Sequence, residues 1–157
     1  MPDKTDTTTP SSVGLWDDVL KSEAFSHEWH VFFVSSGRQQ GWWRIFTRPG
    51  FEHCFAITYD PETARWFIVD WHICFLVAQP LQDEMVEMLI LMAKLEDYKI
   101  VRFKPKHDGR IRYRFGWNYC VSAMKHLLGL QSWAVTPYQL YCHLLKKGGK
   151  EGIAGGA

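Results

Sequence analysis

The sequence predicts a single α+β domain in which an antiparallel sheet packs against a cysteine-bearing helix and further helices. Short runs of aromatic and β-branched residues, separated by turn residues, are typical of strands joined as hairpins. Two segments near the C-terminus carry the start and stop signals of helices. With 157 residues, including 8 Trp, 10 Phe and 6 Tyr, the chain is long and aromatic enough to bury the core of one domain. We expect this domain at 15–149, between flexible tails at 1–14 and 150–157.

Strand signals dominate the first half of the chain. A short amphipathic helix is predicted first, and strand-like runs rich in aromatic and β-branched residues follow it. Turns are expected at 36–40 and at 60–63, where glycine, proline and small polar residues gather. The predicted helix and strands lie at 16–25, 29–35, 41–47, 51–59 and 65–78.

A helix is predicted from Pro80 to about Glu96, because proline is favoured at the first helical position. The methionines Met85, Met88 and Met92 recur along this helix. Methionine commonly fills irregular gaps in protein interiors. We therefore expect the methionine stripe to lie in the core and not on a binding surface.

A second hairpin and two helices complete the predicted domain. The strands of the hairpin are expected at 98–105 and 110–115. The last helix carries agreeing signals at its start, with Thr136 as N-cap, Pro137 at the first position and Gln139 placed to complete a capping box.

Cys120 lies at the start of the other predicted helix, in the segment GWNYCVSAMKHLLGL. Asn118 is a good N-cap, which would make Cys120 the second helical residue, and Gly129 supplies the end of the helix. A helix N-terminus favours negative charge, and the thiolate is the nucleophilic form of cysteine. Cys120 is therefore the candidate nucleophile.

The remaining cysteines, Cys54, Cys74 and Cys142, lie within apolar runs. We interpret them as reduced, buried thiols, because this is the commonest state of cysteine in such surroundings. Their spacing matches no zinc-binding pattern. We expect neither a metal ion nor a cofactor.

His53 is the candidate partner of Cys120, and the length of the hairpin loop decides which residue faces it. A loop at 60–63 sets His53 opposite Asp70, whereas a loop at 61–64 sets it opposite His72. We favour Asp70, because a carboxylate accepts a hydrogen bond from the distal ring nitrogen and stabilises the imidazolium. His72 is the alternative third residue.

These segments follow one another in an order that matches a known family: FEHCFAI, WFIVDWH, GWNYCVSAMKHLLGL and TPYQLY, within about 50–147. The order resembles the circularly permuted papain-like thiol hydrolases, relatives of the NlpC-type cell-wall peptidases with small phage-encoded members. In unpermuted relatives the cysteine helix precedes the histidine strand. The resemblance implies a permuted papain-like fold with Cys120 as nucleophile, His53 as base, and Asp70 or His72 as the orienting group. It also implies hydrolysis of an amide or isopeptide bond in a peptide or peptidoglycan substrate, without a cofactor.

Cations alternate with apolar residues along the second predicted hairpin. A loop at 107–109 would bring all of them to one face of the hairpin. Such a strip suits nucleic acid or another anionic polymer, but charged edge strands also protect sheets against aggregation, and we favour that interpretation. The cations are Arg102, Lys104, Lys106, Arg110, Arg112 and Arg114.

Two interpretations compete with a hydrolase. The chain could be a virion or assembly protein that uses the same fold as a docking scaffold for other virion proteins, or a nucleic-acid-binding module that depends on the basic hairpin alone. We place the nucleic-acid interpretation last. The N-terminal residues are polar and no apolar run reaches bilayer length, so we expect no signal peptide and no contact with a membrane. The protein is then expected in the cytoplasm, or incorporated in a virion after synthesis there.

Overall fold

The computed structural model describes residues 27–35, 47–72, 75–105 and 119–152. Within these residues the chain forms a six-stranded antiparallel sheet and three helices, which confirms the α+β class. The strands are β1 (Trp29–Val34), β2 (His53–Asp60), β3 (Arg65–His72), β4 (Phe75–Leu81), β5 (Lys99–Phe103) and β6 (Lys150–Glu151). The helices are α2 (Asp83–Leu95), α3 (Cys120–Leu127) and α4 (Pro137–Lys146).

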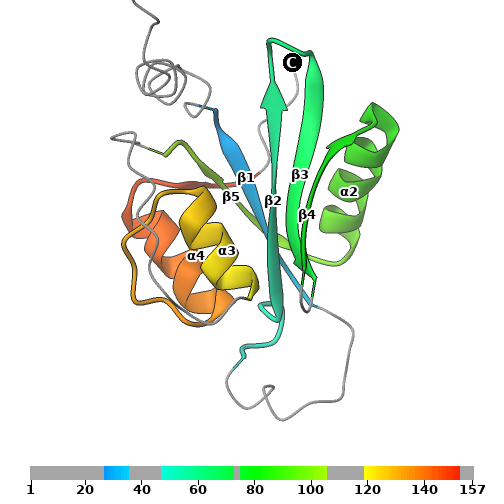
Figure 1. Ribbon diagram of the computed structural model, residues 1–157. Helices are drawn as coiled ribbons and strands as arrows, with labels where there is room; N and C mark the ends of the chain where they lie inside the picture. Colours follow the sequence, from blue (N-terminus) through cyan, green and yellow to red (C-terminus); the bar gives the residue numbers. More distant parts are fainter. Residues whose placement is uncertain (1–26, 36–46, 73–74, 106–118, 153–157) are drawn as a thin grey trace, which may run out of the picture.

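The sheet has the strand order β4-β3-β2-β1-β5-β6. The first four strands follow one another as an antiparallel meander, and α2 then carries the chain across to β5, which pairs with β1. Helix α2 lies on one face of the sheet, and α3 and α4 lie together on the other (Figure 1). The described part of the chain is therefore a three-layer arrangement with the sheet in the middle.

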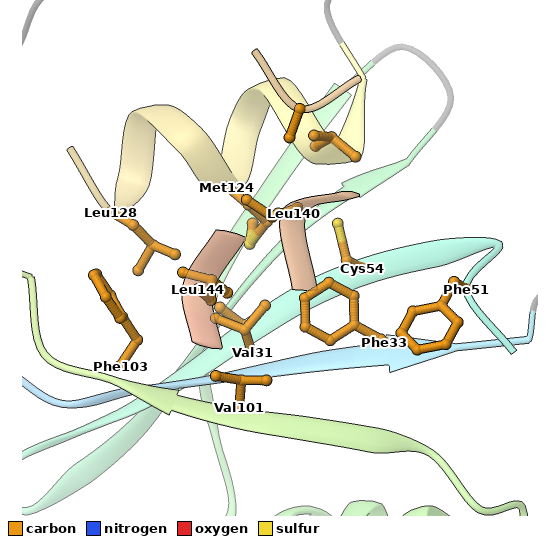
Figure 2. Close-up of a cluster of buried hydrophobic side chains, with 13 residues drawn as sticks. Val31, Phe33, Phe51, Cys54, Val101, Phe103, Met124, Leu128, Leu140 and Leu144 are labelled. Carbon is orange, nitrogen blue, oxygen red and sulfur yellow. The ribbon is translucent and has the colours of Figure 1, made fainter. Parts of the chain in front are cut away.

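Both faces of the sheet carry core residues, which explains why its central strands read as continuous apolar runs. Successive side chains of β1 alternate between the faces: Val31 and Phe33 lie in the cluster under α3 and α4, whereas Phe32 and Val34 lie in the cluster under α2. Figure 2 shows the first cluster, in which side chains of the strands meet those of α3 and α4.

The beginnings of α3 and α4 differ. The capping box of α4 is confirmed, since the Thr136 hydroxyl accepts the Gln139 backbone N–H over 3.2 Å and the Gln139 side chain accepts the Thr136 N–H in return. In α3 the N-cap is Tyr119, which makes no side-chain capping bond, so Cys120 is the first helical residue and not the second. Asn118, the predicted cap, lies outside the described residues.

The predicted strand at 65–78 and the predicted helix start at Pro80 were wrong. The chain reverses between His72 and Phe75, which pair with each other, so the apolar run forms two strands. None of the usual turn residues marks this reversal, because the sequence reads WHICFL there. Pro80 lies in β4, at the edge of the sheet where its missing N–H is tolerated. Helix α2 begins only at Asp83.

The prediction that the methionine stripe lies in the core was also wrong. Met85, Met88 and Met92 are exposed by 41, 57 and 41%, whereas the buried residues of α2 are Val86 and Ala93. The helix carries apolar residues on nearly every side. Such a pattern does not indicate which side faces the sheet.

The second predicted hairpin does not form as expected at Arg102. This residue, which we expected to oppose Arg114, lies in β5 between His30 of β1 and Lys150 of β6. Lys150 and Glu151, which we expected in the C-terminal tail, form β6. Lys104 is exposed just beyond β5.

Other predictions fall where the structure gives no description. They are the cations Lys106, Arg110, Arg112 and Arg114, Cys74, the predicted helix at 16–25 and the predicted strands at 41–47 (apart from Thr47) and 110–115. Across the described ranges, no helix is long and apolar enough to span a membrane.

Candidate active site

The candidate site lies at the end of the sheet where β2 and α3 begin. His53 is the first residue of β2, and Cys120 is the first residue of α3. The pairing of β2 with β3 ends at Ala56 and Val69, short of His53. Helix α3 packs against both strands at this end of the sheet. The start of the helix is thereby brought to the start of β2.

The register of the β2–β3 hairpin differs from the one we favoured. Asp60 stays in β2 opposite Arg65, so the loop is 61–64 and not 60–63. The Asp60 carboxylate accepts a backbone N–H and a hydroxyl from the loop, at 3.0 and 2.6 Å. These bonds close a turn that begins after the aspartate. The competing register, which the sequence left as the alternative, is therefore the one observed.

Asp70 nevertheless contacts His53. Continued to the end of β3, the observed register sets His53 opposite His72 and diagonal to Asp70, and diagonal neighbours lie within reach of long side chains. His53 Nε2 donates to Asp70 Oδ1 over 2.7 Å, and His72 Nε2 lies 3.2 Å from Asp70 Oδ2. Asp70 is buried, whereas His72 is largely exposed. The structure brings both candidate third residues together, with Asp70 between the two imidazoles.

The surroundings of Cys120 change the pKa of its thiol. The strongest influence on its pKa is a hydrogen bond from the Cys54 thiol; burial opposes this influence, and a hydrogen bond and the charge of His53 add to it, together with the backbone N–H of Cys54. The result lowers the pKa of Cys120 to about 5. At neutral pH the described environment therefore holds Cys120 as a thiolate.

His53 carries the complementary charge. Burial of its ring favours the neutral form, but hydrogen bonds to Asp70 and Cys120 and the charges of both outweigh burial and raise the pKa of His53 to about 9. Because Nε2 is bound to Asp70, the other ring nitrogen, Nδ1, is the one left to face Cys120. Cys120 and His53 thus form a thiolate–imidazolium pair that Asp70 anchors.

The position of Cys120 also supplies backbone donors. The first N–H groups of an α-helix have no partner within the helix. Cys120 opens α3, so its own N–H belongs to this set and lies next to its sulfur. An oxyanion that forms on a carbonyl attacked by this sulfur would find a donor there.

A metal centre is not built from these side chains. Within 27–35, 47–72, 75–105 and 119–152, no three of the His, Cys, Asp and Glu residues are grouped so that they could hold a metal ion. The described cysteines Cys54, Cys120 and Cys142 are all free thiols.

Cys54 is the residue of this site that sequence reasoning missed. We expected a buried thiol, and Cys54 is completely buried, but it also contacts Cys120. The sequence indicates this role only in that Cys54 follows His53 directly in β2. Because neighbouring side chains of a strand point to opposite sides, this adjacency did not predict that both His53 and Cys54 contact the Cys120 sulfur.

No family model, no curated protein and no solved structure matches this chain.

Proposed function

We propose that this protein is a thiol hydrolase of the permuted papain-like type that cleaves an amide or isopeptide bond. The observation that carries the proposal is the hydrogen bond of 2.7 Å that holds His53 to the buried Asp70, and the lowered pKa of Cys120 and the raised pKa of His53 support it. A buried carboxylate, an imidazole and a thiol at a helix start are the components of nucleophilic catalysis by cysteine. The order of their segments in the chain supports the permuted papain-like fold.

The reaction would proceed in two halves. The Cys120 thiolate attacks the carbonyl carbon, and the carbonyl oxygen gains the negative charge beside the Cys120 N–H. The C–N bond then breaks as His53 gives its proton to the leaving amine, which leaves a thioester on Cys120. Neutral His53 takes a proton from water, and the resulting hydroxide attacks the thioester. The carboxylic acid is released, and the thiolate–imidazolium pair is restored.

Asp70 and His72 act through His53 in this proposal. Asp70 fixes the orientation of the ring and stabilises its positive charge, as a carboxylate does behind a catalytic imidazole. His72 holds the second oxygen of Asp70 at 3.2 Å. Both are positioning residues, because neither lies on the path of the transferred proton.

The nucleophile is tested first by measuring alkylation of each cysteine against pH, by mass spectrometry. Cys120 should react with iodoacetamide well below pH 8, and faster than Cys142, which is also partly exposed on a helix. In His53→Ala the fast reaction of Cys120 should be lost. If Cys120 reacts no faster than Cys142, the thiolate is absent and the proposal is wrong.

The substrate class is tested with purified peptidoglycan and its soluble peptides. The wild type should release new amino groups from the peptides, and Cys120→Ala should reduce the rate by at least about a thousandfold, since it removes the nucleophile. Cys142→Ala is the matched control and should retain the wild-type rate. Equal activity in Cys120→Ala would show that this thiol is not the nucleophile.

A docking scaffold for an assembly, such as a virion, is the second candidate function. It is favoured by the apolar residues on the outer side of α2, where Met88, Leu91 and Leu95 are exposed by 57, 56 and 71%. Contiguous exposed apolar surface often marks a protein–protein contact. This candidate predicts that the biological function survives Cys120→Ala.

A further inference from the structure

The Cys120 sulfur has an unusual neighbour in Cys54. The described site needs a thiol, an imidazole and a carboxylate, and a second cysteine has no step in the reaction. Yet Cys54 has no exposed surface and lies in the core cluster against which Cys120 packs, and a hydrogen bond from its thiol is the main cause that lowers the pKa of Cys120. A buried polar group in contact with a nucleophile needs an explanation from the chemistry of the site.

The direction of this hydrogen bond follows from the two environments. Complete burial raises the pKa of Cys54 well above its usual value, and the negative charge on Cys120 beside it raises it further. Cys54 therefore keeps its proton, whereas Cys120 has lost its own. A neutral thiol is a donor and a thiolate is only an acceptor, so Cys54 donates and Cys120 accepts.

The surroundings keep this donor in place. Cys54 lies in the core under α3 and α4, among fully buried neighbours that include Phe33, Val121 and Met124. Its sulfur points from β2 toward the helical layer (Figure 2). Interior side chains packed at this density have few alternative rotamers. The S–H group is thus held ready and does not have to be ordered when substrate binds.

We propose that Cys54 is a positioning residue for the nucleophile: its buried thiol donates a hydrogen bond to the Cys120 sulfur and keeps this sulfur anionic and directed at His53. The inference rests on the proposed function, in which Cys120 is the nucleophile. It adds a donor that acts before substrate arrives and that is independent of the imidazole.

The test compares substitutions that keep or remove the donor at one position. Cys54→Ala removes the donor and suits an apolar site, whereas Cys54→Ser keeps a donor but buries a hydroxyl in the core. We expect Cys54→Ala to raise the midpoint of the Cys120 alkylation profile by about one pH unit, as loss of a hydrogen bond to a charged group does. Cys54→Ser should stay within a few tenths of a unit of the wild type. Cys142→Ala is the control that leaves the profile unchanged.

A purely structural role for Cys54 predicts the opposite ranking. Ser would then disturb the packing around Cys120 more than Ala, and the two variants would show equal profiles or a larger shift for Ser. Thermal unfolding of each variant shows whether it is folded. The isosteric pair Cys54→Val and Cys54→Thr repeats the comparison at constant shape, without and with a donor, if the smaller pair does not fold.

Other ionisable groups near Cys120 do not account for a difference in the alkylation midpoint between the two members of a pair. They are His53 on β2, Asp70 on β3 and Tyr119 just before α3, and all of them are present in both members of each pair. Burial raises the pKa of Tyr119 above its ordinary value, so it stays neutral over the measured range.

The two hypotheses fail in different ways. An unchanged alkylation midpoint in Cys54→Ala, with a reactive Cys120 in the wild type, overturns the role of Cys54 and leaves the hydrolase proposal standing. Equal shifts in Cys54→Ala and Cys54→Ser overturn it as well. A wild-type Cys120 that does not react below pH 8 overturns the hydrolase proposal, and the role of Cys54 with it.

Discussion

The two faces of the sheet carry helices that are buried to very different extents. On one face, α3 and α4 bury Val121, Met124, Leu140 and Leu144 completely. On the other, α2 buries only Val86 and Ala93, and several of its large apolar residues remain exposed. The helix that carries the candidate nucleophile belongs to the well-packed face. Precise placement of a reactive group requires a rigid support, and this face supplies it.

The largest expected effect separates two methionines on opposite faces. Met124→Ala, at a position with no exposed surface, should lower the free energy of unfolding by about 2–5 kcal/mol, because it leaves a cavity between α3 and the sheet. Met88→Ala, at a position exposed by 57%, should change it by less than about 0.5 kcal/mol. Urea unfolding of both variants measures the difference. Equal losses would mean that the outer side of α2 is covered in solution.

The next effect compares two aspartates. In the wild type the thiolate–imidazolium pair forms as pH rises through about 5, where Cys120 loses its proton, and is lost through about 9, where His53 loses its proton. Asp70→Asn removes a charge that stabilises the imidazolium. The pH at which the pair is lost, its upper pH limit, should therefore fall by about one pH unit or more. Asp97→Asn, which changes an exposed carboxylate beyond the end of α2, should leave both limits in place.

These limits are measured by following the His53 ring protons by NMR and the hydrolysis rate across the same pH range. A rate that is independent of Asp70 would mean that His53 is oriented by other contacts. His72→Gln gives the intermediate case, because it removes the outer partner of Asp70 and keeps the carboxylate that contacts His53.

The smallest effect compares the starts of two helices. Thr136→Ala removes the capping box of α4 and should cost about 1 kcal/mol of stability. Gln82→Ala, at the N-cap of α2, should cost a few tenths of a kcal/mol or less, because its side chain makes no capping bond. Both values follow from urea unfolding. A larger loss at Gln82 would show that the beginning of α2 is more ordered by its cap than the structure indicates.

Local patterns predicted the parts of the fold that depend on a few neighbouring residues. The strand at Trp29–Val34 and the capping box at Thr136 were both predicted, because alternation, apolar runs and capping signals act within one element. Cys120 at the start of a helix was predicted for the same reason, although its position was wrong by one residue. A cap is decided by backbone angles at a single residue, and a good capping side chain at 118 was not enough to fix it.

Contacts between elements could not be predicted in the same way. The exposure of Met88 depends on which side of α2 faces the sheet, and a helix with apolar residues on nearly every side does not specify this. The reversal between His72 and Phe75 was missed because no turn residue marks it. The preferred third residue, Asp70, contacts His53 in a register that we did not favour, since diagonal neighbours also meet across a strand pair.

The sequence by itself determined the class of the fold and the residue types available for chemistry: a histidine within one predicted strand, a carboxylate two positions before another histidine on the next, and a cysteine at a helix start. The tertiary structure decided how they meet. It set Asp70 between two imidazoles and brought the buried thiol of Cys54 to the sulfur of Cys120. The physical reason is that secondary structure depends on short-range signals, whereas these contacts depend on strand register and on the packing of a helix against a sheet, which residues far apart in the sequence determine together.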